Sequence, residues 1–205
     1  MLEFLRGKTS FRKLRLFACA CCRRLRLVVK NKTLRGLIET IELYADGLAT
    51  TKDFLPFSRE YEQGREKICG AGAVFRAAGS AQDLYPRVSK QEAAYRAASD
   101  TVEMCLGPFT WKEKVDRKRA VLSQVLRDIT GNPFHPVAFN PDWLTSTVKA
   151  LAKAFYAEQH FDDLPVLADA LEEAGCTNEE ILNHCRQPGD HVRGCWVIDL
   201  VLGKN

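Results

Sequence analysis

The 205-residue sequence has no apolar run that approaches the roughly 20 residues needed for a membrane-spanning helix. It also opens without a recognisable secretory signal, because charges are scattered through "MLEFLRGKTSFRKLRLF" and no small-residue cleavage site follows. These absences predict a soluble cytoplasmic protein with no membrane partner. The 46% hydrophobic and 27% charged residues are an ordinary globular composition.

Familiar catalytic signatures are missing as well. The chain contains no Gly-rich phosphate loop, no dinucleotide-binding fingerprint and no metalloprotease helix. It also shows no tandem repeat of fixed period. We therefore favour a non-catalytic protein over an enzyme.

Acidic residues are absent between Arg6 and Arg35, a stretch that contains eleven lysines and arginines. Between Glu158 and Asp190 the balance is reversed, with nine acids and one basic residue. A basic end of this kind can bind nucleic acid through phosphate contacts. The candidate nucleic-acid-binding residues are Arg12, Lys13, Arg23, Arg24, Arg26 and Lys30. Alternatively, the two ends neutralise each other in the fold, and we favour that interpretation.

The apolar residues follow a helical period almost throughout the chain. In the first long segment they form the face Leu14, Phe17, Ala18, Cys21, Leu25 and Val28. The pattern predicts an all-α fold, a compact multi-helix domain of about seven to nine helices. A proline-rich connector, "NPFHPVAFNP", separates an amino-terminal helical region, 1–131, from a carboxyl-terminal one, 140–205. We expect the second region to pack back on the first helix within one structural domain.

Capping signals predict where several helices begin and end. Ser89 opens a capping box before one helix, and Gly131 should end the next. Asn140 should cap a helix in the carboxyl-terminal region, and Asp190 should cap the last one. Residues 67–88, rich in Gly and Ala, are expected to form one short helix and a loop.

The chain has eight cysteines, but a disulfide framework is not expected in a protein without a secretory signal. Most of the thiols should pack as small apolar groups, and Cys21 lies in the middle of an apolar helix face. Cys19 and Cys22 lie three residues apart on another stripe, beside arginines that would favour the thiolate. They could share a metal ion or react, but we favour the alternative that a second helix covers them.

The stretch "HCRQPGDHVRGCW", residues 184–196, combines two histidines, two cysteines and a Pro-Gly turn. If the last helix includes His191 and Cys195, they lie four residues apart on one face and could be metal ligands. With Cys19 and Cys22 they would complete a Cys3His zinc site that joins the two ends of the chain. The alternative, which we favour on sequence grounds, is that Cys195 is a core residue and the histidines bond the backbone near the turn.

Both ends of the sequence carry specific motifs, "MLEFLRGKTSFRKLRLFACACCRR" at the start and "WLTSTV", "LADALEEAGC" and "HCRQPGDHVRGCW" near the end. These motifs resemble a family of uncharacterised proteins from planctomycete bacteria. Members also occur joined to other modules, so the resemblance implies an accessory or interaction domain and no particular activity. The chain departs from the family pattern at His135, where arginine is usual, which argues against an essential role for that position.

These features together favour a non-catalytic protein-interaction or regulatory module with a protein partner. The first alternative is a zinc-stabilised nucleic-acid-binding module. The second is a thiol-dependent enzyme, in which Cys19 or Cys22 would be the nucleophile, His191 the base, and Asp199 or Asp190 the orienting group.

Overall fold

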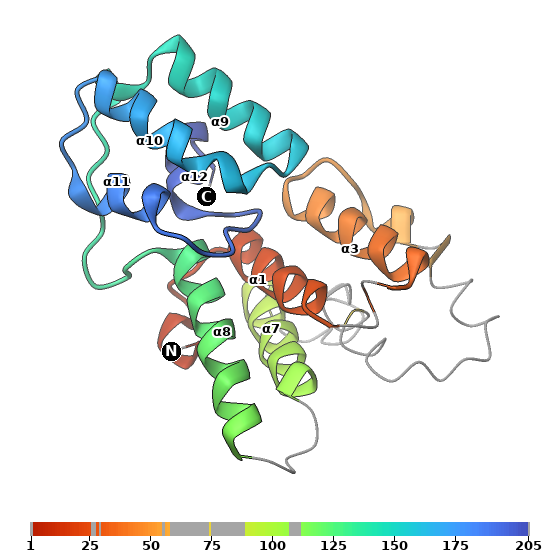
Figure 1. The fold of residues 1–205 in the computed structure, drawn as a ribbon. Coiled ribbons are helices and arrows are strands. Elements are labelled where there is room, and N and C mark those ends of the chain that lie inside the picture. Colours follow the sequence, from red (N-terminus) through yellow and green to blue (C-terminus); the bar gives the residue numbers. More distant parts are fainter. Residues whose placement is uncertain are drawn as a thin grey trace. The chain divides into compact units, whose positions relative to one another are not determined.

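The computed structural model describes residues 2–25, 28, 30–54, 56–57, 74, 89–106 and 112–204. Its described part contains eight α-helices, some short 3-10 helices and no strand, which confirms the predicted all-α fold (Figure 1). Within that part, no helix combines the length and the apolar character needed to cross a membrane. The helix and loop expected at 67–88 fall outside the described residues, apart from Val74.

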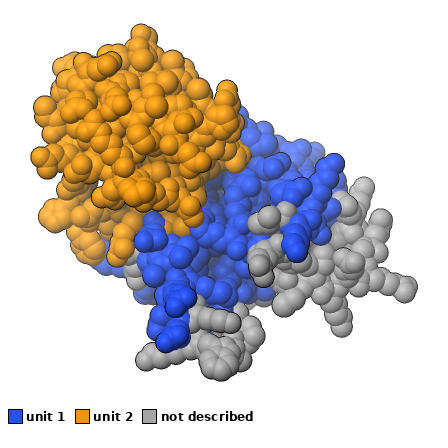
Figure 2. Space-filling view, viewed as in Figure 1, with its two compact units in different colours: residues 1–124 blue, residues 125–205 orange. Residues whose placement is uncertain are grey.

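The chain divides into two compact units, Met1–Gln124 and Val125–Asn205, each described here by itself (Figure 2). The division falls inside one helix, α8 (Lys112–Thr130), a few residues before the proline-rich connector. Gly131 ends α8 as predicted, with a φ of +65° that only a residue without a side chain adopts at little cost. The expected packing of the carboxyl-terminal region on the first helix concerns both units and stays a prediction.

Unit 1 is built around α1 (Phe11–Arg23), which packs against α3 (Lys32–Ala45) and α7 (Lys90–Leu106). Short 3-10 helices, Glu3–Leu5 and Thr51–Phe54, precede α1 and follow α3. The predicted capping by Ser89 is confirmed, because its hydroxyl accepts from the Glu92 N–H at 3.2 Å.

Unit 2 contains the last residues of α8 and four further helices: α9 (Ser146–Glu158), α10 (Leu164–Glu173), α11 (Glu179–Arg186) and α12 (Trp196–Leu202). These four helices enclose one apolar core, to which each contributes fully buried side chains. Its largest fully buried members include Leu164, Leu167, Leu171, Ile181 and Ile198. Burying a side chain of this size contributes about 1.5–3 kcal/mol, so this core stabilises the four helices as a group.

Two predicted helix starts in unit 2 are wrong. Asn140 caps only a 3-10 helix, Pro141–Trp143, and α9 begins later with Thr145 as its cap. The last helix does not begin at Asp190, because Gly194 has a φ of +96° that interrupts any helix there. Cys195 is the residue that precedes α12.

Candidate metal centre

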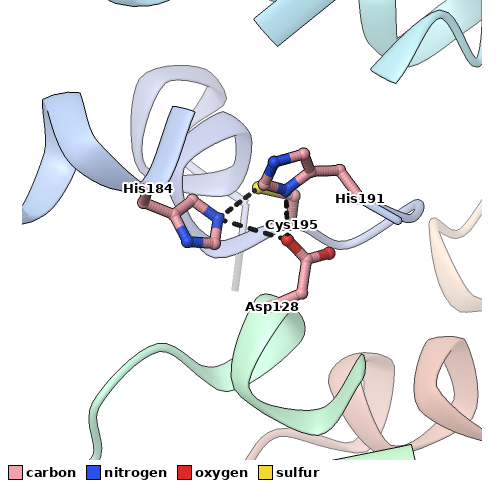
Figure 3. A group of neighbouring side chains, drawn as sticks. All are labelled: Asp128, His184, His191 and Cys195. Atoms are coloured by element: carbon pink, nitrogen blue, oxygen red, sulfur yellow. Dashed lines mark hydrogen bonds and ion pairs between the residues drawn. The ribbon is translucent and has the colours of Figure 1, made fainter. Parts of the chain in front are cut away.

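Four side chains with metal-binding atoms meet in unit 2, namely Asp128, His184, His191 and Cys195 (Figure 3). One nitrogen, oxygen or sulfur atom from each lies within 4.8 Å of the corresponding atoms of the other three. Figure 3 shows that the residues approach one another from the end of α8, from α11, and from the segment that leads into α12. His191 and Cys195 are candidate ligands predicted from the sequence, whereas Asp128 and His184 are not among the predicted ligands.

Local structure explains how each residue reaches the centre. Asp128 lies in the last turn of α8, and His184 in the last turn of α11, whose cap Asn178 accepts from two backbone N–H groups at 3.0 and 3.2 Å. Between α11 and α12 the chain makes a turn, residues 187–194, which we call the ligand turn. His191 lies within this turn, and Cys195 directly follows it. The two residues do not share the helix face that the sequence suggested.

The Asp128 carboxylate contacts both histidines of the cluster and one backbone N–H group. Its Oδ1 lies 2.6 Å from Nδ1 of His191 and 3.2 Å from Nε2 of His184. Its Oδ2 accepts a hydrogen bond of 2.9 Å from the backbone N–H of Val192. The same Nε2 of His184 lies 3.2 Å from Sγ of Cys195, so all four residues are linked by direct polar contacts.

These separations nearly suit a tetrahedral metal ion. Metal–ligand bonds of about 2.0–2.3 Å place ligand atoms about 3.3–3.8 Å apart at the corners of a tetrahedron. The two contacts of 3.2 Å are close to that range, and the 2.6 Å contact between Asp128 and His191 is shorter. An ion would therefore have to separate the closest pair by less than about 1 Å.

The cluster is withdrawn from solvent. Cys195 is fully buried, and the side chains of Asp128, His191 and His184 are 8%, 9% and 17% exposed. Burying a carboxylate or an imidazole is unfavourable unless its polar atoms are paired or bound to a metal. In unit 2 as described, Nε2 of His191 is buried without a hydrogen-bond partner.

Electrostatics couple Asp128 to the two imidazoles. Burial acts to raise the pKa of Asp128, but the hydrogen bonds and charges of His184 and His191 outweigh it and lower that pKa below its usual value. Burial likewise acts to lower the pKa of His191, but the hydrogen bond with Asp128 and the Asp128 charge outweigh burial and raise it. In the metal-free chain, Asp128 and His191 therefore each stabilise the charged form of the other.

The Cys195 thiol is kept protonated in the absence of a metal. Burial raises its pKa well above the ordinary value, and the nearby Asp128 charge adds to that effect. The backbone N–H groups of Ile198 and Val197 act in the opposite direction but do not prevail. A bound cation would change this balance, because metal ions bind the thiolate and displace its proton.

The other predicted ligands, Cys19 and Cys22, lie in unit 1 on α1, and both are fully buried there. Burial raises the pKa of Cys19 despite the neighbouring arginines, Arg23 and Arg15. The pKa of Cys22 is raised by a hydrogen bond with Cys105 and by burial. The expectation that arginines favour thiolates here is therefore wrong, because desolvation outweighs their charge. A Cys3His site that includes His191 and Cys195 would have to join the two units, and it stays a prediction.

The predicted basic face of unit 1 is partly neutralised by its own unit. Arg12 is buried and pairs with Asp46 at 2.8 Å, and Arg23 donates two hydrogen bonds of 2.8 Å to Glu42. Arg24 donates to a backbone carbonyl of the preceding turn. Lys13 is half-buried and Lys30 exposed, while Arg26 lies outside the described residues. These pairings leave less charge for phosphate contacts than the sequence suggests.

Comparison of the chain with models of protein families, with curated proteins and with solved structures finds no match. The planctomycete resemblance therefore stays a prediction. The chemistry of the cluster has to be inferred from its own geometry.

Proposed function

We propose that the chain is a non-catalytic helical module that acts through protein interaction or regulation, and that its unit 2 binds one zinc ion. The ligands are Asp128, His184, His191 and Cys195. The observation that supports this proposal is the convergence of four donor atoms within 4.8 Å of one another, two from buried residues and two from half-buried histidines.

The donor set favours zinc over other common ions. One sulfur, two imidazole nitrogens and one carboxylate oxygen are the ligand types that zinc accepts in tetrahedral sites. Magnesium and calcium prefer sets made only of oxygen, and copper(II) prefers a flatter, tetragonal arrangement. Four protein ligands in a buried centre fill a tetrahedron, which is typical of a structural site rather than a catalytic one.

The same geometry disfavours a thiol enzyme centred on Cys195. In a nucleophile–base–acid triad, one imidazole nitrogen faces the nucleophile and the other faces the orienting carboxylate. Here a single nitrogen, Nε2 of His184, contacts both Cys195 and Asp128. The thiol is also fully buried and protonated, whereas reactive cysteines are exposed and ionised.

A zinc-stabilised nucleic-acid-binding module is the alternative function. It needs the basic residues of unit 1 to be available for phosphates, but Arg12 and Arg23 are engaged with carboxylates. Binding to DNA or RNA that weakens steeply with salt would support this alternative over protein interaction.

The proposal is tested by measuring metal in the purified full chain after dialysis against a trace of zinc. We expect about one zinc per chain. The variant Cys195→Ser should lose it, whereas Cys176→Ser, which changes a buried thiol outside the cluster, should retain it. Less than about a tenth of an equivalent in the wild-type chain would overturn the zinc proposal.

A further inference from the structure

The ligand turn is held in place by other kinds of contact than the helices around it. Within unit 2 as described, residues 186–194 contribute no side chain to the apolar core that joins α9, α10, α11 and α12. Positions 186–190 are all exposed, and a side chain added at Gly189 would meet open space. Segments with few buried apolar contacts open at a low free-energy cost while the rest of a domain stays folded.

Polar contacts hold the turn in its place. Both residues in its middle are bound to one carboxylate, His191 through its ring at 2.6 Å and Val192 through its backbone N–H at 2.9 Å. The Arg193 side chain lies over the Tyr156 ring of α9 at 4.6 Å. The chain then reaches Cys195, whose neighbours Val197 and Ile198 are fully buried in the core. The middle of the turn is thus bound to Asp128. Its end continues into α12, which is held by its own buried apolar side chains.

We infer that the metal ion gates this turn: metal binding at Asp128, His184, His191 and Cys195 holds residues 187–194 closed on the end of α8, and metal loss lets them open more often while α12 stays docked. The inference rests on the proposed zinc site and adds its regulation. His191 lies within the turn, Cys195 directly follows it, and His184 lies in the last turn of α11 before it. The turn therefore cannot open fully while the ion keeps all its bonds. Metal availability then sets how often this segment is open.

Opening is measurable because the turn contains a trypsin site after Arg193. If the turn must release the ion before it opens, the fraction open falls by the factor 1 + [Zn]/Kd. The full chain, held in buffers of known free zinc and treated with trace trypsin, should be cleaved after Arg193 about 100 times more slowly at 100 times Kd than without metal. Cleavage after Arg96, on α7 of unit 1, is the internal control and should not change.

Two variants complete the experiment. Cys195→Ser should be cleaved in the turn at a rate that does not depend on zinc, and Cys176→Ser should behave as the wild type. One zinc per chain with an unchanged rate after Arg193 would overturn the gating inference and leave the zinc site standing. Equal slowing at both trypsin sites would also overturn it, because the ion would then stabilise the whole chain. Absence of bound zinc in the same samples would instead overturn the proposed function.

Discussion

Among the residues that the structure describes, the two units bury their cysteines equally well but surround them differently. In unit 1, Cys19 and Cys22 are fully buried on a helix packed against other helices, and Cys22 has a further thiol, Cys105, as its hydrogen-bond partner. In unit 2, Cys195 is just as buried, yet it touches an imidazole that also touches a carboxylate. Burial therefore does not distinguish a packing thiol from a metal ligand. The neighbours do, because a metal needs several donor atoms around one point.

The largest expected effect compares one thiol from each unit. Cys195→Ser should weaken zinc binding by about 100-fold or more, because it removes a ligand where even outer-shell changes cost about 10- to 100-fold. Cys21→Ser, at an equally buried position on α1, should leave zinc affinity unchanged. A competition titration with a chromophoric chelator measures both. Equal losses in the two variants would show that the cluster in unit 2 is not the site.

The order of the two variants should reverse when the stability of the metal-free chain is compared instead of its zinc affinity. Cys21→Ser places a hydroxyl in an apolar environment and should destabilise the chain by about 1–3 kcal/mol. In metal-free Cys195→Ser the new hydroxyl still has His184 as a partner, so the loss should be smaller. Urea unfolding in the presence of a chelator compares them, and a larger loss for Cys195→Ser would contradict the comparison.

A smaller effect is expected at the end of α8, where Trp196 packs on Gly131. A Cβ at Gly131 would lie 3.2 Å from the Trp196 ring, and the φ of +65° is unfavourable for any other residue. The Trp196 ring also lies 5.0 Å from the His184 ring, so this contact borders the metal centre. Gly131→Ala should cost about 1–2 kcal/mol in thermal or urea unfolding. No measurable loss would mean that α8 is not held there.

The smallest effect concerns pH in the metal-free chain. The pKa of His191 is raised when folded, so its stabilising contribution is complete below about pH 6.5 and is lost as pH rises through the folded value. The pKa of Asp128 is lowered, so its contribution is complete above about pH 4 and is lost as pH falls through the folded value. The pair should therefore stabilise the chain more at about pH 5.5 than at about pH 8.5.

Unfolding of the chelated chain at these two pH values, with Asp128→Asn as the control, measures that difference. The control should show less of it, because the carboxylate that raises the pKa of His191 is gone. Zinc affinity should change in the opposite direction and increase with pH, since protons compete with the ion for His191 and Cys195. If the wild type and the control showed the same pH dependence, the Asp128–His191 pair would not contribute to the pH dependence of stability.

Features that depend on neighbouring residues could be predicted from the sequence, whereas features that depend on contacts between distant residues could not. Helical periodicity and capping depend on neighbours in the sequence, so the all-α class, the cap at Ser89 and the stop at Gly131 could be predicted. The predicted start of the last helix at Asp190 is wrong, because Gly194 breaks the helix although the segment before it has helix-compatible residues. That error placed His191 and Cys195 on one helix face, although both belong to the candidate site for another reason.

Asp128 could not be found from the sequence. It lies in an ordinary helix end, and its partner His191 is 63 positions away, so only the folded chain brings them together. His184 was assigned to a backbone contact near the turn, because nothing local shows that its ring faces Cys195. Cys19 and Cys22 were paired with the turn because their spacing suits ligation. Spacing alone does not reveal that both cysteines are buried within unit 1, where α1 packs against other helices.

X-ray absorption spectroscopy of the zinc-loaded full chain tests the central claim most directly, since it counts sulfur ligands. Ligation by Asp128, His184, His191 and Cys195 predicts one sulfur at about 2.3 Å and three nitrogen or oxygen atoms at about 2.0–2.1 Å. Three sulfurs would contradict the account and support the Cys3His set with Cys19 and Cys22. A shell without sulfur would contradict both.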